Sequence, residues 1–144
     1  MADQQFQAVV DVVNGMEVHS HVRDFTFVMD EPTSVGGTNK GMNPIEALLS
    51  ALGGCKAIVI QVFARARKMK INKVSITVDG TLDPDGHSGK NPSAKVGLSK
   101  IKTTYHIEAD NSPEEIQDFV DFVEKTCPVL DSIVNAPVME VEID

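Results

Sequence analysis

The sequence predicts an α+β fold in which antiparallel sheet packs on one long central helix. Three observations predict it. The first thirty residues alternate between apolar and polar positions, a strongly capped helix begins at Asn43, and alternation returns after residue 73. The predicted order of elements is βββ-α-ββ-α-α-β. At 144 residues the chain is long enough to bury a core without disulfides or metal, so we expect a single domain over residues 1–144.

The N-terminal segment predicts three strands, over residues 6–12, 16–22 and 24–30. Asn14 and Gly15 form a dipeptide that is typical of a hairpin turn, and they separate the first two strands. Residues 31–41 are polar and rich in glycine. We expect them to connect the last of these strands to the central helix without entering the core.

The central helix has clear start signals. Asn43 suits the N-cap, Pro44 the first helical position, and Glu46 completes a capping box. Apolar or small residues then recur at 45, 48, 52, 55, 59, 62 and 66, which predicts one buried face carrying Cys55. Gly53 and Gly54 each cost about 1 kcal/mol relative to alanine in mid-helix. We therefore expect a packed element or a substrate to approach the helix backbone closely at this point.

The second half of the chain predicts strands over residues 73–82 and 96–109, joined by a turn-rich loop. Ser112 and Glu115 form a second capping box and begin another helix. Pro128 ends that helix, and Cys127 becomes the N-cap of a short one. Alternation over residues 137–143 predicts a final strand.

Composition excludes several classes of function. The chain carries 21 acidic and 13 basic side chains, for a net charge of −8, and has only six Phe, one Tyr and no Trp. Such a surface repels phosphate backbones and offers little for bases to stack on, so we expect no nucleic-acid partner. The sequence shows no secretory signal pattern and no apolar run approaching membrane-spanning length, which predicts a cytoplasmic protein with reduced thiols and no membrane partner.

The two cysteines, Cys55 and Cys127, are the strongest candidates for chemistry. At a helix N-cap, Cys127 would face free N–H groups that stabilise a thiolate. Cys55 lies in mid-helix, where a reactive thiolate needs a nearby cation. The plain alternatives are that Cys55 is a small buried hydrophobic residue and that Cys127 is a neutral cap.

Other site chemistries lack support in the sequence. There is no CxxC, no HxxxH and no phosphate-binding loop, so we expect no metal site. His19 and His21 share a strand face, a pattern more often found on a solvent-exposed strand than at a metal. A cysteine hydrolase with a histidine base has no local signature, and it would depend on one cysteine only.

The run from Gly37 to Cys55, G-T-N-K-G-M-N-P-I-E-A-L-L-S-A-L-G-G-C, together with C-P-V at Cys127, resembles the OsmC/Ohr family of thiol-dependent hydroperoxide reductases. The likeness extends over nearly the whole chain. It implies an intertwined homodimer without a bound cofactor, in which Cys55 is the peroxidatic and Cys127 the resolving cysteine. In the organic-hydroperoxide branch a Glu directly follows the helix Pro and pairs with an Arg. Here Ile45 takes that place, Glu46 follows it, and Arg23 is the best candidate for the arginine.

The resemblance implies a three-step mechanism. Cys55 thiolate attacks a hydroperoxide and becomes a sulfenic acid, Cys127 condenses with it to a disulfide, and an external dithiol reduces the disulfide. The apolar helix face around Leu48, Leu52 and Val59 favours an organic hydroperoxide. Further apolar residues of this helix require a second copy to cover them: Leu49, Ile58, Ile60 and Phe63. The shifted Glu46 favours one alternative, a non-catalytic binding or structural dimer that has lost peroxidase activity.

Overall fold

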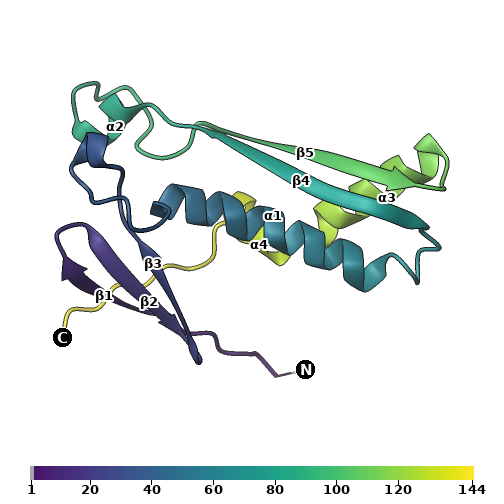
Figure 1. The fold of residues 1–144 in the computed structure, drawn as a ribbon, viewed down its shortest axis with the longest axis horizontal. Coiled ribbons are helices and arrows are strands. Elements are labelled where there is room, and N and C mark those ends of the chain that lie inside the picture. Colours follow the sequence, from purple (N-terminus) through teal and green to yellow (C-terminus); the bar gives the residue numbers. More distant parts are fainter. Residues whose placement is uncertain (1) are drawn as a thin grey trace. The chain divides into compact units, whose positions relative to one another are not determined.

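The computed structural model describes residues 2–144, which divide into a compact N-terminal unit ending at Leu48 and a second unit, Leu49–Asp144. The first contains a three-stranded sheet and the second a two-stranded sheet, so the single sheet expected from the sequence is replaced by two (Figure 1). Both sheets are antiparallel, and helices complete an α+β architecture as predicted. The single domain over 1–144 stays a prediction.

The N-terminal sheet has the strand order β1-β2-β3, with β1 over Val9–Asn14, β2 over Glu17–Val22 and β3 over Phe25–Met29. These strands match the three predicted ones. Gly15 forms the predicted turn between β1 and β2 in the left-handed conformation, with φ of 60°. All six residues of β1 are exposed to solvent, so this strand buries neither of its faces within the chain.

The connection after β3 is held in place by one carboxylate. Asp30 is 2% exposed, and its side chain accepts hydrogen bonds from the backbone N–H groups of Glu31, Thr38 and Lys40 and from the Thr38 hydroxyl. A short 3-10 helix, η1, spans Thr33–Val35. A Cβ atom on Gly37 would lie 1.9 Å from the Glu31 carbonyl oxygen, so this position requires glycine. The loop therefore lies outside the core, as expected, but is tightly organised.

Helix α1 spans Pro44–Phe63 and begins with the predicted capping box. Asn43 Oδ1 accepts from the Glu46 N–H, and Glu46 Oε2 accepts from the Asn43 N–H, both at 2.8 Å. The buried face differs from the predicted one, since Val62 is 62% exposed. The residues that α1 buries are Leu52, Lys56, Val59 and Ile60.

The second sheet pairs β4, Ile71–Thr81, with β5, Lys100–Ala109, as an antiparallel ribbon alongside α1 (Figure 1). A Cβ atom on Gly53 would lie 3.1 Å from the Val78 side chain of β4, which confirms a close approach at Gly53. Nothing lies within 4 Å of a Cβ placed on Gly54, so the described chain explains only the first of the two glycines.

Three further helices follow in the second unit. The short helix α2, Pro84–Ser88, was not predicted; it begins at Asp83, whose side chain accepts from the Asp85 N–H. Helix α3, Pro113–Thr126, has the predicted capping box between Ser112 and Glu115. Helix α4, Pro128–Val134, has Cys127 as its N-cap, as predicted.

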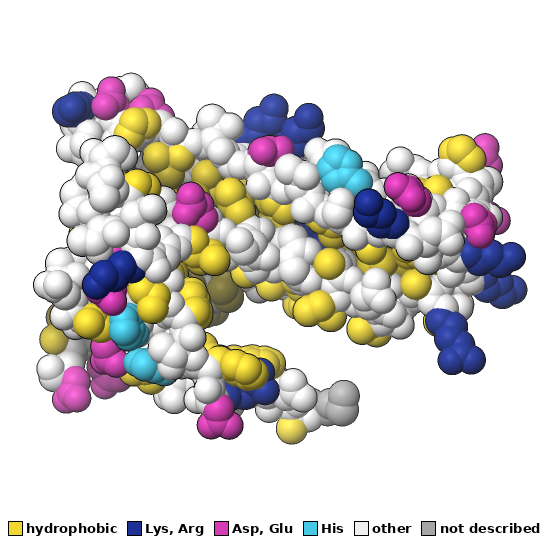
Figure 2. All heavy atoms as spheres, in the orientation of Figure 1, with side chains coloured by type: hydrophobic (Ala, Val, Ile, Leu, Met, Phe, Trp, Pro, Cys, Tyr) yellow, Lys and Arg dark blue, Asp and Glu magenta, His cyan; other side chains and the backbone are white. Residues whose placement is uncertain are grey.

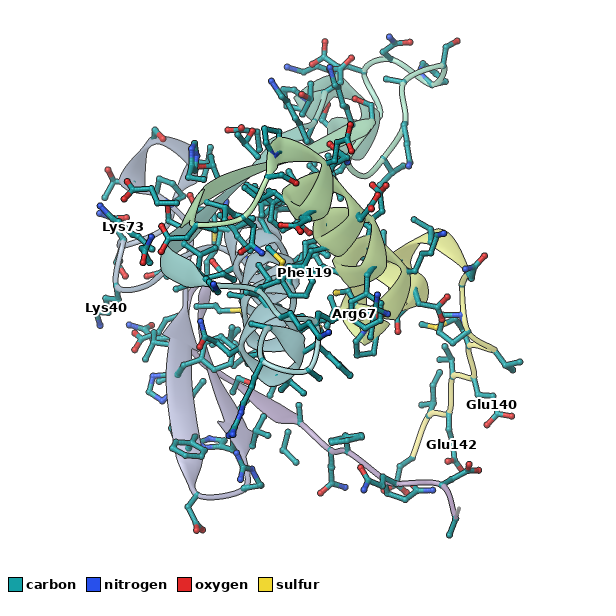
Figure 3. All side chains as sticks on the ribbon, turned by 90° about the vertical axis from the view of Figure 1, so that its right-hand side faces the viewer. Lys40, Arg67, Lys73, Phe119, Glu140 and Glu142 are labelled. Carbon is teal, nitrogen blue, oxygen red and sulfur yellow. The ribbon has the colours of Figure 1, made fainter. Side chains whose placement is uncertain are left out.

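The core of the second unit lies between α1 and α3. It is formed by Val59 and Ile60 of α1 and by Phe119 and Val123 of α3, all of them less than 8% exposed. Figure 3 shows Phe119 on the side of α3 that faces α1. The guanidinium of Arg67 stacks on the Phe122 ring at 3.6 Å, so this arginine covers an aromatic side chain after α1 has ended.

The strand predicted over residues 137–143 is wrong for this chain, because no described strand edge pairs with that segment. The segment after α4 is extended, and Figure 3 shows Glu140 and Glu142 on it. An extended segment without a neighbouring strand forms no ladder of hydrogen bonds, whatever its alternation. Its apolar residues are 81–94% exposed: Val138, Met139, Val141 and Ile143.

The expectation that no apolar run approaches membrane-spanning length is also wrong. By length and composition alone α1 is long and apolar enough to span a membrane. It has 20 residues, with a mean hydropathy of 1.6 over its most apolar window. Only 22% of that window is buried inside the chain. This stretch is hard to recognise in the sequence because alanine and glycine stand between its large apolar residues and because Lys56 interrupts it.

Candidate functional site

The two cysteines lie together in the second unit, and both are free thiols. Cys127 is 1% exposed and sits at the junction of α3 and α4, where its sulfur accepts a hydrogen bond from the Leu130 N–H at 3.4 Å. Cys55 is half-buried and packs against the core between α1 and α3. The two side chains are neighbours, close enough for Cys55 to raise the pKa of Cys127. The fold therefore brings together two thiols that are distant in the sequence.

The N–H groups at the N-cap favour a thiolate at Cys127, as expected, but burial outweighs them. Burial raises the pKa of the Cys127 thiol above its ordinary value, and the neighbouring Cys55 raises it further. The backbone N–H groups of Val129 and Leu130 lower this pKa but do not outweigh the loss of solvation. Cys127 is accordingly a protonated thiol at neutral pH.

An ion pair with a buried cation joins α1 to α3. The Lys56 side chain is 2% exposed, and its ammonium contacts Glu124 Oε1 at 2.7 Å and donates to Thr103 Oγ1 at 2.9 Å. The Tyr105 hydroxyl donates to the same carboxylate oxygen. No buried side-chain nitrogen or oxygen in the described chain lacks a hydrogen-bond partner. We call these four side chains, from α1, β5 and α3, the Lys56 cluster.

One member of the Lys56 cluster, Tyr105, is influenced electrostatically by Cys127. The pKa of Tyr105 is raised strongly, first by burial, then by the hydrogen bond and charge of Glu124, and also by a charge at Cys127. The Lys56 ammonium lies 5.8 Å from the centre of the Tyr105 ring. Tyr105 is therefore a neutral hydrogen-bond donor near Cys127.

A cavity of about 610 Å³ opens beside the Lys56 cluster, all four members of which line it. Leu52 lines it too, as predicted for an apolar pocket, but Leu48 and Val59 do not. Its remaining apolar wall comes from β5, α3, α4 and the loop before β5, through Leu98, Ile101, Val120, Leu130, Ile133 and Val134. The sulfur atoms do not line this cavity, although Lys56, which follows Cys55 in the chain, does.

Arg23 and Glu46, the predicted electrostatic partners of Cys55, belong to the N-terminal unit. Arg23 occupies the turn between β2 and β3 with φ of 53°, and its guanidinium lies 5.0 Å from the centre of the Phe25 ring. Glu46 is engaged in capping α1 through Asn43. Among the ion pairs formed within residues 2–144, none joins Arg23 to Glu46. Their roles in catalysis stay predictions.

The histidines engage in local contacts. His19 contacts Glu17 at 2.9 Å, His21 contacts Thr26 at 2.9 Å, and in the second unit His106 contacts Thr77 at 3.0 Å. His106 follows Tyr105 in β5, so it faces the opposite side of the sheet from the Lys56 cluster. Over residues 2–144 no three potential metal ligands come together.

Sequence reasoning missed the Lys56 cluster. The signal for Lys56 was present, because positions 52, 56, 59 and 60 form one stripe at helical spacing and Lys56 interrupts an otherwise apolar stripe. Thr103 and Tyr105 are two positions apart in β5 and therefore lie on one face of that strand. No local signal identified Glu124 as the partner, because the two residues meet only through packing of α1 on α3.

The whole arrangement is typical of one family. A family model described as OsmC-like protein matches residues 37–142, a span that contains α1, both cysteines and the Lys56 cluster. The chain belongs to the OsmC-like protein family. The recognition made from the two cysteine motifs is thereby confirmed.

Individual relatives agree with this assignment. A protein of Mycoplasma pneumoniae named hydroperoxide reductase is 31% identical over 107 residues, which cover 74% of this chain and 72% of that protein. Its Mycoplasma genitalium counterpart, also named hydroperoxide reductase, is 33% identical over 93 residues, 62% of this chain and 60% of that protein. The crystal structure of an OsmC-like protein from Mycoplasma pneumoniae superposes with a TM-score of 0.81 at 27% identity, covering 94% of this chain and 91% of that one.

Proposed function

We propose that this OsmC-like protein is a thiol-dependent peroxidase that reduces organic hydroperoxides with Cys55 and Cys127. The observation that carries the proposal is that the two thiols are neighbours in the fold, close enough for Cys55 to raise the pKa of Cys127, in a partly buried site. The relatives named hydroperoxide reductase support the same reaction class. We further propose that the protein acts in the cytoplasm, where an external dithiol can restore both thiols.

In the first step the Cys55 thiolate attacks the distal oxygen of the hydroperoxide, R–O–O–H. An S–O bond forms, the O–O bond breaks, and the leaving alkoxide takes up a proton to become an alcohol. Cys55 is oxidised to a sulfenic acid and the peroxide is reduced by two electrons. The half-buried position of Cys55 leaves its sulfur accessible to a small reactive group.

In the second step the Cys127 sulfur attacks the Cys55 sulfenic sulfur. The new S–S bond displaces hydroxide, and the proton of the Cys127 thiol converts that hydroxide into water. A resolving cysteine that keeps its proton until this moment fits the raised pKa of Cys127. Disulfide closure requires the two Cα atoms to come within about 7 Å, which we expect here.

The test is consumption of an alkyl hydroperoxide by the pure protein with a dithiol as reductant. Cys55→Ser should abolish turnover, lowering kcat/KM by about 1000-fold or more, as for loss of a nucleophile. Cys127→Ser should still consume one equivalent of peroxide and should accumulate a sulfenic acid that dimedone traps. Equal activity of Cys55→Ser and wild type would overturn the proposal.

We also propose that the working protein is a homodimer. Apolar side chains remain exposed on both units, and Figure 2 shows them (yellow) on the surface. They include Val12 and Phe25 of the N-terminal sheet, at 77% and 63% exposure, and Ile58 of α1 at 65%. Of the four residues expected to need a partner, Ile60 is instead fully buried in the core. A second copy of the chain would bury such surfaces. A monomeric mass by light scattering would contradict the proposed homodimer.

One observation favours a second candidate, a non-catalytic dimer. Glu46 is occupied in capping α1 and does not pair with Arg23 within the chain. A protein of this kind would bind ligands without turnover. The peroxide assay separates the two candidates, because the non-catalytic dimer predicts no peroxide consumption by wild type.

A further inference from the structure

A second cavity, of about 610 Å³, lies where α1 ends and β4 begins. Among the described residues its wall holds four basic side chains and no acidic one. The four are Arg65, Lys68, Lys70 and Lys73, and we call this hollow the basic cavity. Figure 1 shows the turn between α1 and β4 at the end of the β4–β5 ribbon away from α2, and Figure 2 shows Lys and Arg side chains (dark blue) gathered at that end. Its volume is that of a small-molecule site, roughly 300–1,000 Å³.

The positive charge of the basic cavity contrasts with the rest of the chain. The net charge is −8, yet positions 65–73 hold five of the 13 basic residues. No acidic residue occurs anywhere between Glu46 and Asp79 in the sequence. Because salt screens distant charges, an anion close to this segment is affected mainly by the local cations and much less by the acidic remainder of the surface.

The four cations of the basic cavity have no partner within the described chain. Over residues 2–144 the basic side chains of all ion pairs lie elsewhere, and the lysines that donate side-chain hydrogen bonds are Lys40 and Lys56. The carboxylate of Glu115 is within electrostatic reach of Lys70, but it accepts hydrogen bonds from Ser112 and Asn111 and does not line the cavity. Like charges on one wall repel one another, and an anion bound between them removes that repulsion.

The backbone that carries these cations is fixed by hydrogen bonds. Asn111 accepts from the Lys70 N–H at 2.7 Å and donates to the Lys68 carbonyl at 3.2 Å, so one side chain holds both residues. The Met69 N–H donates to the Ala64 carbonyl at 2.8 Å. Lys68 has φ of 56°, in the left-handed region where a helix end usually has glycine. A turn that is ordered in this way loses little further backbone entropy when a ligand binds.

We propose that the basic cavity binds a small organic molecule with two or more negative charges, of phosphate or carboxylate chemistry. Arginine and lysine are the side chains that recognise these groups, through charge-assisted hydrogen bonds. The negative end of the α1 dipole, about half a charge, opposes an anion here but is outweighed by four cations. The rest of the wall offers two amides and an apolar surface for an organic body: Gln61, Asn72, Ala64, Met69, Ile71 and Val74. Neither cysteine lines the basic cavity, so this site is independent of the proposed peroxidase reaction.

The experiment is isothermal titration calorimetry of the full chain with pyrophosphate and with citrate, at a constant ionic strength of about 0.1 M. We expect one site per chain with a Kd of about 1 mM or tighter, which weakens as NaCl is raised. Arg65→Gln and Lys70→Gln should each weaken binding about tenfold, since each removes a charge-assisted hydrogen bond. Both side chains are exposed, so both variants should fold. Lys102→Gln is the matched control, because Lys102 is exposed on β5, lies outside the wall and changes the net charge equally.

The two probes distinguish the sources of the anion. Binding of pyrophosphate alone identifies phosphate esters as the ligand class, binding of citrate alone identifies polycarboxylates, and binding of both means that charge matters more than geometry. The inference is overturned if neither probe binds, or if Lys102→Gln weakens binding as much as Arg65→Gln does, since the attraction then belongs to the whole surface. Sedimentation with phosphatidylserine vesicles completes the test. Vesicle binding without binding of either small anion overturns the inference in favour of a membrane surface.

Discussion

At the scale of single residues, buried charged side chains are the feature that is hardest to predict from the sequence. Lys56 is the one cation of α1, yet it is more buried than Val59 one turn later. Its burial depends on Glu124, which lies in a different helix, and a lysine without that partner would not remain charged in the core. A lysine four residues after a buried apolar residue, on the same helix face, indicates a buried charge only when its acidic partner is known.

Asp30 is a second buried charge, and it stabilises the loop that precedes α1. Its hydrogen bonds with Thr38, Glu31 and Lys40 lower its pKa from 3.8 to about 2. Because the folded pKa lies below the ordinary value, this stabilisation is complete above about pH 4 and is lost as pH falls towards 2. We expect Asp30→Asn to lower the thermal unfolding midpoint by several degrees at pH 7 and to flatten its dependence on pH below 4.

The control for Asp30 is Asp24→Asn, an exposed position in the turn between β2 and β3. Thermal unfolding followed by circular dichroism from pH 2 to 7 measures both variants. Identical pH profiles for wild type and Asp30→Asn would show that the loop does not depend on this carboxylate.

Cys127 predicts the opposite pH dependence. Its pKa is raised above the ordinary value near 9 by burial, so the folded state holds its proton more tightly than the unfolded chain does. The sign follows directly: this thiol does not affect stability below pH 9, and stability decreases as pH rises above 9. We expect the thermal midpoint of wild type to fall between pH 9 and 10 more steeply than that of Cys127→Ser, and parallel curves would contradict the burial effect.

At the scale of elements, the sequence predicts what depends on local signals. The hairpin at Gly15, the capping boxes at Asn43 and Ser112, and the N-cap at Cys127 all form as predicted, because each is fixed by residues within a few positions. The prediction of a final strand is wrong because alternation shows which side chains share a face, but it does not show that a neighbouring strand is available for pairing. The short helix α2 was missed because Asp83 and Pro84 suit a turn as well as a helix start.

The glycine pair in α1 gives a test at this scale. Gly53 is explained by Val78, whereas Gly54 faces open space on the exposed side of α1 that carries Ile58 and Val62. If a second copy packs on that side, Gly54→Leu should weaken the dimer by about tenfold or more, since an added side chain prevents close approach. In a helix face open to solvent the same change should instead stabilise the protein by up to about 1 kcal/mol.

Sedimentation velocity across a concentration series measures the association of Gly54→Leu beside that of wild type. A Gly54→Leu protein that is both dimeric and more heat-stable than wild type would mean that this face of α1 stays free.

At the scale of the whole molecule, the described chain leaves apolar surface where a finished fold would bury it. Strand β1 is exposed along its length, α1 is only partly covered, and the segment after α4 pairs with nothing in the chain. Each of these elements has the spacing of apolar residues that is typical of an element with a buried face. The sequence predicted a second copy as the cover for α1 only. For β1 and the segment after α4 it does not state whether the cover comes from the same chain or from another copy.

The last prediction concerns the extended C-terminal segment. Val138, Val141 and Ile143 are at least 90% exposed, although Val141 and Ile143 alternate with Glu140 and Glu142 as in a half-buried strand. An extended segment of this pattern gains both its hydrogen bonds and its apolar burial by adding to a sheet edge of a second copy. Removing residues 136–144 should therefore convert the dimer into a monomer at micromolar concentration, while the capping boxes and the core around Phe119 keep the remaining chain folded. Val141→Asp should have the same effect in weaker form, since it disrupts one buried position and keeps the backbone, and Glu142→Gln on the opposite face should have none. Light scattering measures all three, and a truncated protein that stays dimeric with an unchanged dissociation constant would show that the segment contributes nothing to assembly.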